Sequence, residues 1–144
     1  MLYRISPYTI GKSTYKRRIK NTECRNEVTD QEGEILCEYF DTFIKKGELV
    51  KNNFQKSIIY VPQGKEQTNI SFDLYRSDSI DQIYIDKNIE LIGSFSIEVN
   101  EPNIPRNERK VNLTMIFGSC ITVQAKNLNS GKIVEVSANY YKRD

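Results

Sequence analysis

Short runs of β-branched and aromatic residues follow one another along this chain, separated by Gly, Pro, Asn and Asp. Within residues 68–75, Ile70, Phe72 and Leu74 alternate with polar neighbours, and residues 111–115 alternate in the same way. A period of two places the apolar side chains on one face of an extended strand, whereas helical periodicity is poor throughout the chain. The pattern predicts strands at roughly 3–10, 35–45, 56–61, 67–76, 91–99, 109–117, 119–126 and 132–140.

Two turn signals connect the last three runs. Gly118-Ser119 predicts a two-residue hairpin with Gly at the first position of a type II′ turn. Asn129-Ser130-Gly131 predicts a second hairpin. Short strands at near-regular spacing are typical of all-β proteins, so we expect an eight-stranded antiparallel β-sandwich that forms a single domain over residues 1–144.

Residues 16–34 interrupt the regular succession of predicted strands, because they contain almost no apolar run. Five basic residues and no acid lie between Lys12 and Lys20, whereas seven acids and one base lie between Glu23 and Asp41. A long polar loop is uncommon inside a compact domain and is usually functional or mobile. The sequence therefore predicts an inserted polar loop at about 16–34.

Composition argues against an enzyme. The chain has 144 residues, a formal net charge of +2 and no histidine. The absence of histidine removes the commonest general base, the commonest neutral metal ligand and every triad that contains His. Lys12 and Ser13 are adjacent, and adjacent strand residues point to opposite faces, so they do not form a Ser–Lys nucleophile pair. We expect a binding or structural module without catalytic residues, metal or cofactor.

The cysteines and the apolar runs bear on location. Cys24, Cys37 and Cys120 lie far apart without a C-x-x-C pair, so we expect reduced thiols. The chain contains no apolar run long enough to span a membrane, and its start does not resemble a secretory signal. The N-x-S/T sequons at Asn69 and Asn112 lie inside predicted strands and are interpreted as chance. These features favour a cytoplasmic protein without a membrane partner.

The run from Tyr15 to Lys20 combines basic residues with an aromatic side chain, a combination that can bind nucleic acid. The acids that follow cancel its charge within the same loop, and the whole chain is nearly neutral. We therefore expect no nucleic-acid partner.

Several segments together resemble one known family. They are IGSFSI at 92–97, PNIPR at 102–106, VNLT at 111–114, ITVQAKN at 121–127, SGK at 130–132, ISPYTIG at 5–11 and QTNISF at 67–72. In this order and spacing they resemble the substrate-binding β-domain of the seventy-kilodalton heat-shock protein chaperones. The matches span about 5–136, nearly the whole chain.

The resemblance implies a chaperone of the stress response that captures extended apolar segments of unfolded proteins. Main-chain hydrogen bonds would hold the peptide, and one apolar side chain would enter a central pocket. Ile58 or Ile59 would supply the wall position that is aromatic in the family, and Tyr15 and Val61 would form an arch over the peptide. The implied peptide-binding residues are Thr14, Tyr15, Ile58, Val61, Ile70, Phe72, Val111 and Leu113, and Arg106 would help to latch a helical lid. Inward-facing aliphatic residues of a sandwich are also ordinary core residues, and this alternative stays open.

Departures from the family pattern suggest a second function. Lys12 stands where the family has an apolar wall residue, and the 16–34 insertion borders the implied peptide channel. Arg4 replaces an acidic residue at the linker junction, which weakens the case for docking to a nucleotide-binding domain. The family's ATPase domain and helical lid are missing here, so we expect a fragment of a longer chaperone, and the alternative is a stand-alone relic module. The alternative is a non-chaperone interaction module with an occluded groove, whose protein partner docks on the 16–34 loop.

Overall fold

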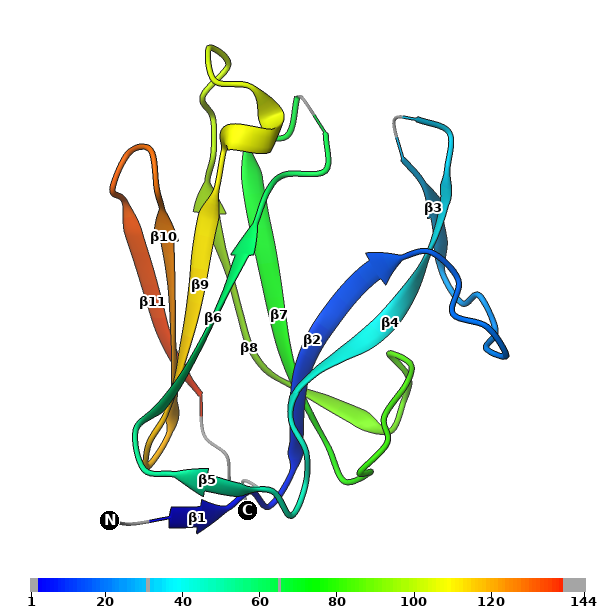
Figure 1. Ribbon diagram of the computed structural model, residues 1–144, viewed down its shortest axis with the longest axis vertical. Coiled ribbons are helices and arrows are strands. Elements are labelled where there is room, and N and C mark those ends of the chain that lie inside the picture. The colour runs from blue at the N-terminus through cyan, green and yellow to red at the C-terminus, as the bar shows by residue number, and fades with distance from the viewer. Residues whose placement is uncertain (1–2, 31, 65, 139–144) are drawn as a thin grey trace.

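The computed structural model describes residues 3–30, 32–64 and 66–138 (Figure 1). They form an all-β fold without an α-helix in this part of the chain, which confirms the all-β part of the predicted fold class. The elements are β1 (Tyr3–Ile5), β2 (Thr9–Lys16), β3 (Glu27–Thr29), β4 (Ile35–Ile44), β5 (Leu49–Lys51), β6 (Phe54–Tyr60), β7 (Asn69–Ser77), β8 (Ile89–Glu98), the 3-10 turn η1 (Arg106–Glu108), β9 (Val111–Phe117), β10 (Ile121–Asn127) and β11 (Ile133–Ala138).

The strands form three antiparallel sheets rather than the expected eight-stranded arrangement. The strand orders are β11-β10-β9-β6, β3-β4-β2-β7-β8 and the small pair β1-β5. The predicted run 3–10 is divided between β1 and β2, while β3 and β5 are short strands that no run of apolar residues indicated. Residues 139–140, the end of the last predicted strand, lie outside the described residues.

The two larger sheets share one hydrophobic core (Figure 1). Strand β9 shows how the alternating pattern builds it, because Val111, Leu113, Met115 and Phe117 are buried while the residues between them are partly exposed. Leu113 pairs with Ala125 of β10 on one side and with Ile58 of β6 on the other. The other sheet contributes apolar side chains from β2, β4, β7 and β8 to the same core. The period-two pattern thus reports burial as well as strand formation.

One of the two predicted hairpin turns is wrong in detail. Gly118 does not have a positive φ, and the pair Phe117–Ile121 closes a loop of three residues, so the turn is not a two-residue type II′ turn. The second turn is confirmed: Gly131 has φ 79° between β10 and β11. The Asn127 side-chain oxygen accepts hydrogen bonds from the backbone amides of Asn129 and Ser130, which orders this turn locally.

Strand β2 lies between β4 and β7, and its two pairings differ in length. It pairs with β7 only through Thr9–Lys12, whereas its pairing with β4 continues to Lys16. At Gly11, where the register with β4 shifts, the phenyl ring of Phe40 and the backbone of Asp41 approach the backbone closely. A β-carbon at this position would lie 2.6 Å from the Phe40 ring. Glycine is therefore required by the close approach of the two strands.

The Gly11→Ala variant should lower the free energy of unfolding by about 2 kcal/mol, because an added methyl group overpacks the β2–β4 contact. Urea unfolding followed by circular dichroism measures the change. Gly118→Ala is the matched control, since its added carbon would meet only a side-chain oxygen of Asn53 at 3.3 Å and a backbone oxygen of Cys120 at 3.8 Å. Equal stability of the two variants would contradict this account.

Candidate functional site

An opening forms where β2 and β7 diverge. After Lys12 in β2 and before Leu74 in β7, the two strands are no longer paired with each other in the described part of the chain. Residues 13–16 pair only with β4, and residues 69–73 pair only with β8. The strands β2 and β4 continue away from the core together with β3 (Figure 1). We call residues 13–30 and 32–40 the arm.

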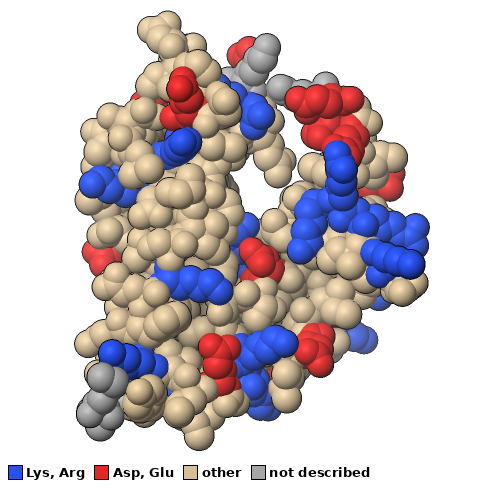
Figure 2. Space-filling model, in the orientation of Figure 1, with Lys and Arg blue, Asp and Glu red and all other residues tan. Residues whose placement is uncertain are grey.

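Figure 2 shows a hollow between the arm and the rest of the molecule. On the side opposite the arm lie the end of β6, the segment that follows it and the start of β7 (Figure 1). We call this hollow the cleft. The arm also carries the charge step of the sequence, with basic side chains gathered near the end of β2 and acidic ones towards the tip of the β3–β4 hairpin (Figure 2).

A disulfide bond between Cys24 and Cys37 fastens the loop of the arm to β4, with 5.1 Å between the two Cα atoms. The expectation of reduced thiols is therefore wrong for these two cysteines, while Cys120 is free. The polar loop folds back so that β3 pairs with β4, and this return brings together cysteines separated by 13 positions. Disulfides persist mainly in oxidising environments, which is at odds with the cytoplasmic location expected from the sequence.

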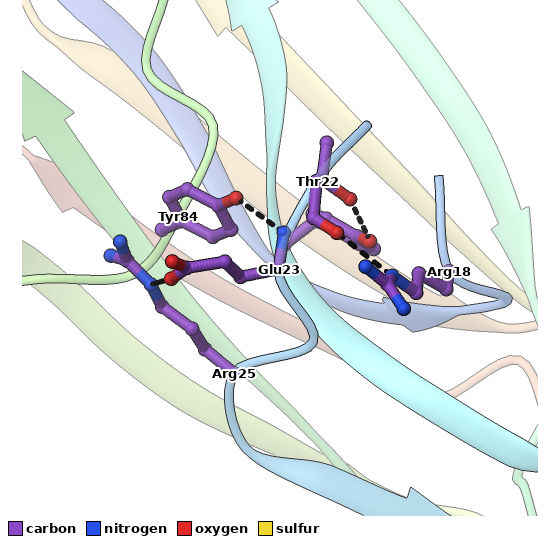
Figure 3. Close-up of polar contacts among 6 residues, drawn as sticks. Arg18, Thr22, Glu23, Arg25 and Tyr84 are labelled. Atoms are coloured by element: carbon purple, nitrogen blue, oxygen red, sulfur yellow. Dashed lines mark hydrogen bonds and ion pairs between the residues drawn. The ribbon is translucent and has the colours of Figure 1, made fainter. Parts of the chain in front are cut away.

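A second set of contacts holds the arm against the connection between β7 and β8 (Figure 3). The backbone amide of Glu23 donates a hydrogen bond of 2.8 Å to the Tyr84 hydroxyl. The Arg25 guanidinium lies 3.8 Å from the centre of the Tyr84 ring and also binds the Glu23 carboxylate at 3.0 Å. Tyr39 of β4 stacks on Tyr84 with 6.2 Å between ring centres. Aromatic and cation–π contacts of this kind give the arm a defined position.

The basic run at the end of β2 is mostly engaged within the arm. Arg17 forms an ion pair with Glu34, and the Nε of Arg18 donates to the backbone oxygen of Thr22 at 2.8 Å (Figure 3). The Lys16 amine lies 5.7 Å from the centre of the Tyr39 ring. The basic side chains Lys16, Arg17 and Arg18 are therefore all in contact with other groups of the arm, and Arg17 is the one that forms an ion pair among the described residues.

Lys12 and Tyr60 meet at the base of the arm. The Lys12 side chain is only 8% exposed, and its Nζ lies 4.5 Å from the centre of the Tyr60 ring. The same Nζ donates a hydrogen bond of 3.0 Å to the backbone oxygen of Ser13. Burial lowers the pKa of Lys12, and the nearby Asp41 carboxylate opposes this shift in part. A cation at this depth makes the floor of the cleft polar.

The Tyr60 hydroxyl is buried and has no hydrogen-bond partner among the described residues. Burial, and after it the charge of Asp41, raises the pKa of Tyr60, so the phenol stays protonated at physiological pH. The Tyr60 ring packs edge-on against Phe72, with 5.4 Å between the ring centres. Tyr60 is thus an aromatic wall between the core and Lys12.

The sequence assigned this aromatic wall position to Ile58 or Ile59. In the structure Ile59 is 50% exposed, and Ile58 is partly buried against the core. In the pattern that the sequence resembles, the wall position lies two residues nearer to Gln67 than Ile58 does, which is the position of Tyr60. Within that resemblance, which is a prediction, the spacing was the signal that indicated Tyr60.

Four other residues implied to bind peptide lie in the hydrophobic core. Ile70, Phe72, Val111 and Leu113 are all buried and pack in the cluster that joins the two larger sheets. All four therefore have the surroundings of ordinary core residues, which is the alternative interpretation of these apolar positions. A role in peptide binding stays a prediction for them.

The remaining implied site residues are distributed around the cleft. Thr14 shares the face of β2 that carries Lys12, whereas Tyr15 lies on the opposite face, where burial and then the Glu38 carboxylate raise its pKa. Val61 is half-buried just after β6. Arg106 donates a hydrogen bond of 2.8 Å to the backbone oxygen of Pro62, so it braces the segment after β6. The structure brings Thr14, but not Tyr15, onto the same face as Lys12.

No protein-family model matches the chain, and no curated protein sequence matches it either. The resemblance to the chaperone domain therefore stays a prediction. Among the described residues, no helix is long and apolar enough to cross a membrane.

The buried Lys12 amine predicts a pH effect on stability. Because its pKa is lowered in the folded protein, the unfolded chain binds an additional proton between that lowered pKa and the ordinary value of 10.5. The free energy of unfolding should therefore rise with pH across this window, relative to the Lys12→Met variant. Urea unfolding at several pH values up to about 10, near the ordinary pKa of tyrosine, measures the difference. A difference between the two proteins that is independent of pH would contradict the prediction.

Proposed function

We propose that this protein binds an extended polypeptide segment in the cleft, by adding a strand between β2 and β7. The observation that carries the proposal is the divergence of these two strands, which are unpaired with each other after Lys12 in β2 and before Leu74 in β7. Neighbouring strands of one sheet normally share a ladder of hydrogen bonds, and here both turn an edge without a strand partner towards the same opening. An added strand is a common way to recognise peptides through their main chain.

The hydrogen-bonding needs of the strand edges support this proposal. Unpaired amide and carbonyl groups along a strand edge are a template for pairing with another chain. Residues 13–16 and residues 69–73 each have an edge without a strand partner. On these edges the Ser13 carbonyl accepts from Lys12 and the Asn69 carbonyl accepts from the Gln67 side chain. The Tyr84 contacts hold the arm in position and the disulfide orders it internally, so little conformational entropy is lost when a segment binds.

The resemblance supplies the finer form of the proposal. The protein would be a divergent β-sandwich peptide-binding domain of a seventy-kilodalton heat-shock protein chaperone, which captures unfolded segments. Its ATPase activity would belong to a nucleotide-binding domain elsewhere in a parent chain. Since the aliphatic residues implied to form the pocket are buried in the core, we assign most of the affinity to main-chain pairing.

One observation favours the alternative of an occluded groove. The Lys12 side chain lies over Tyr60, where the family pattern has an apolar wall, and occupies space that an apolar peptide side chain would need. In that case a specific protein partner would dock on the arm instead. Deletion of residues 17–33 separates the two functions: general peptide binding is gained if the groove is occluded, and an arm-docking partner is lost if the arm is its site.

Main-chain recognition predicts that methylation of the peptide backbone weakens binding. Extended peptides of eight residues, each carrying one N-methyl group, should bind weakly when the group lies at any central position. The reason is that successive amides of a strand point to opposite edges, and the added strand would have β2 on one edge and β7 on the other. Fluorescence anisotropy measures binding, and the unmethylated peptide is the control. Normal binding by peptides methylated at central positions would argue against strand addition.

Filling the cleft should abolish binding. The Thr14→Trp variant places a large ring on the face of β2 that carries Lys12 and should weaken peptide binding about tenfold or more, because the ring crowds the side chains that the added strand would place on that face. Gln55→Trp is the matched control, since Gln55 lies on β6 and is exposed. Thermal unfolding checks that both variants fold. Unchanged binding by a folded Thr14→Trp protein would overturn the assignment of the site.

A further inference from the structure

Two side chains at the base of the cleft have hydrogen-bond donors that are not all used. The Lys12 ammonium has three N–H groups, and one hydrogen bond, to the Ser13 carbonyl, is present. The Tyr60 hydroxyl has no partner within the described part of the chain. Buried polar groups are nearly always hydrogen-bonded, and each exception calls for an explanation.

The neighbouring carboxylate does not satisfy these donors. Asp41 of β4 lies opposite Lys12 of β2 in the strand register. Its negative charge raises the pKa values of both Lys12 and Tyr60. However, no carboxylate of the described residues lies within ion-pair distance of Lys12. Asp41 therefore offsets the charge of the ammonium but leaves its hydrogen-bonding capacity available.

We propose that the cleft selects extended segments that place a hydrogen-bond-accepting side chain, glutamine or glutamate, against Lys12 and Tyr60. The side-chain oxygen of such a residue can accept from the Lys12 ammonium and the Tyr60 hydroxyl. This inference rests on the proposed function, and it names the class of segment that the same site takes. It differs from the apolar preference implied by the resemblance.

Local geometry explains why an aliphatic side chain fits poorly. It would cover the two donors with hydrocarbon and leave them without water or an acceptor, which is unfavourable in a buried site. It would also compete for space with the Lys12 side chain, which already lies against the Tyr60 ring. Because Asp41 balances the charge of Lys12, the neutral amide of glutamine is sufficient, and a full negative charge is not required.

A guest–host peptide series tests the selection. Peptides of identical length and backbone carry glutamine, glutamate, leucine or lysine at one central position, and anisotropy measures their dissociation constants. Glutamine and glutamate peptides should bind about tenfold more tightly than leucine, and lysine should bind most weakly, because it supplies only further donors. Leucine binding as tightly as glutamine would overturn the inference while the proposed function stands. No saturable binding by any peptide would overturn both.

Variants of Lys12 and Tyr60 test whether these two side chains cause the preference for glutamine. Lys12→Met should remove most of the preference for glutamine over leucine, and Tyr60→Phe, which retains the ring and its packing on Phe72, should reduce it. Lys56→Met is the matched control, because this β6 amine lies over the ring of Phe43, not Tyr60. A preference for glutamine that persists in a folded Lys12→Met, Tyr60→Phe double variant would show that other groups select the side chain.

Discussion

Strand β2 takes part in two pairings of unequal length, and the rest of the structure depends on this inequality. Its first residues join β7 and enclose the common core, while its last residues follow β4 out of the sheet. Gly11 permits the close approach of β4 at the point where the register shifts. A strand cannot form hydrogen bonds with both neighbouring strands once these separate. The divergence of β2 from β7 therefore creates the arm, the cleft and two edges without a strand partner.

An arm that leaves the core must be stabilised by contacts of its own. Few apolar residues are available within 16–34, and the structure uses the Cys24–Cys37 disulfide and the stacking on Tyr84 in their place. A covalent bond reduces the freedom of the unfolded chain, and aromatic contacts need little area to fix an orientation. The polar composition of the loop is thus compatible with an ordered segment.

The sequence predicted much of the fold and part of the site. Alternation located the strands that build the core, such as β9, because burial on one face imposes a period of two. It did not locate β3 or β5, which are three residues long and stabilised by their partners. Tyr60 was missed because the wall position was assigned to Ile58 or Ile59, whereas in the structure the Tyr60 ring packs against Phe72 and Lys12. The pairing of Cys24 with Cys37 was missed because three separated cysteines do not specify a partner.

What the sequence determined by itself is the all-β class, the positions of the principal strands and the polar character of residues 16–34. These follow from local patterns, since neighbouring residues decide which face of a strand is apolar. The tertiary structure alone decided that β2 leaves β7, that the polar loop returns to form a disulfide, and that Lys12 is buried beside Tyr60. Each of these depends on residues far apart in the chain, and their contact is set by the packing of whole strands.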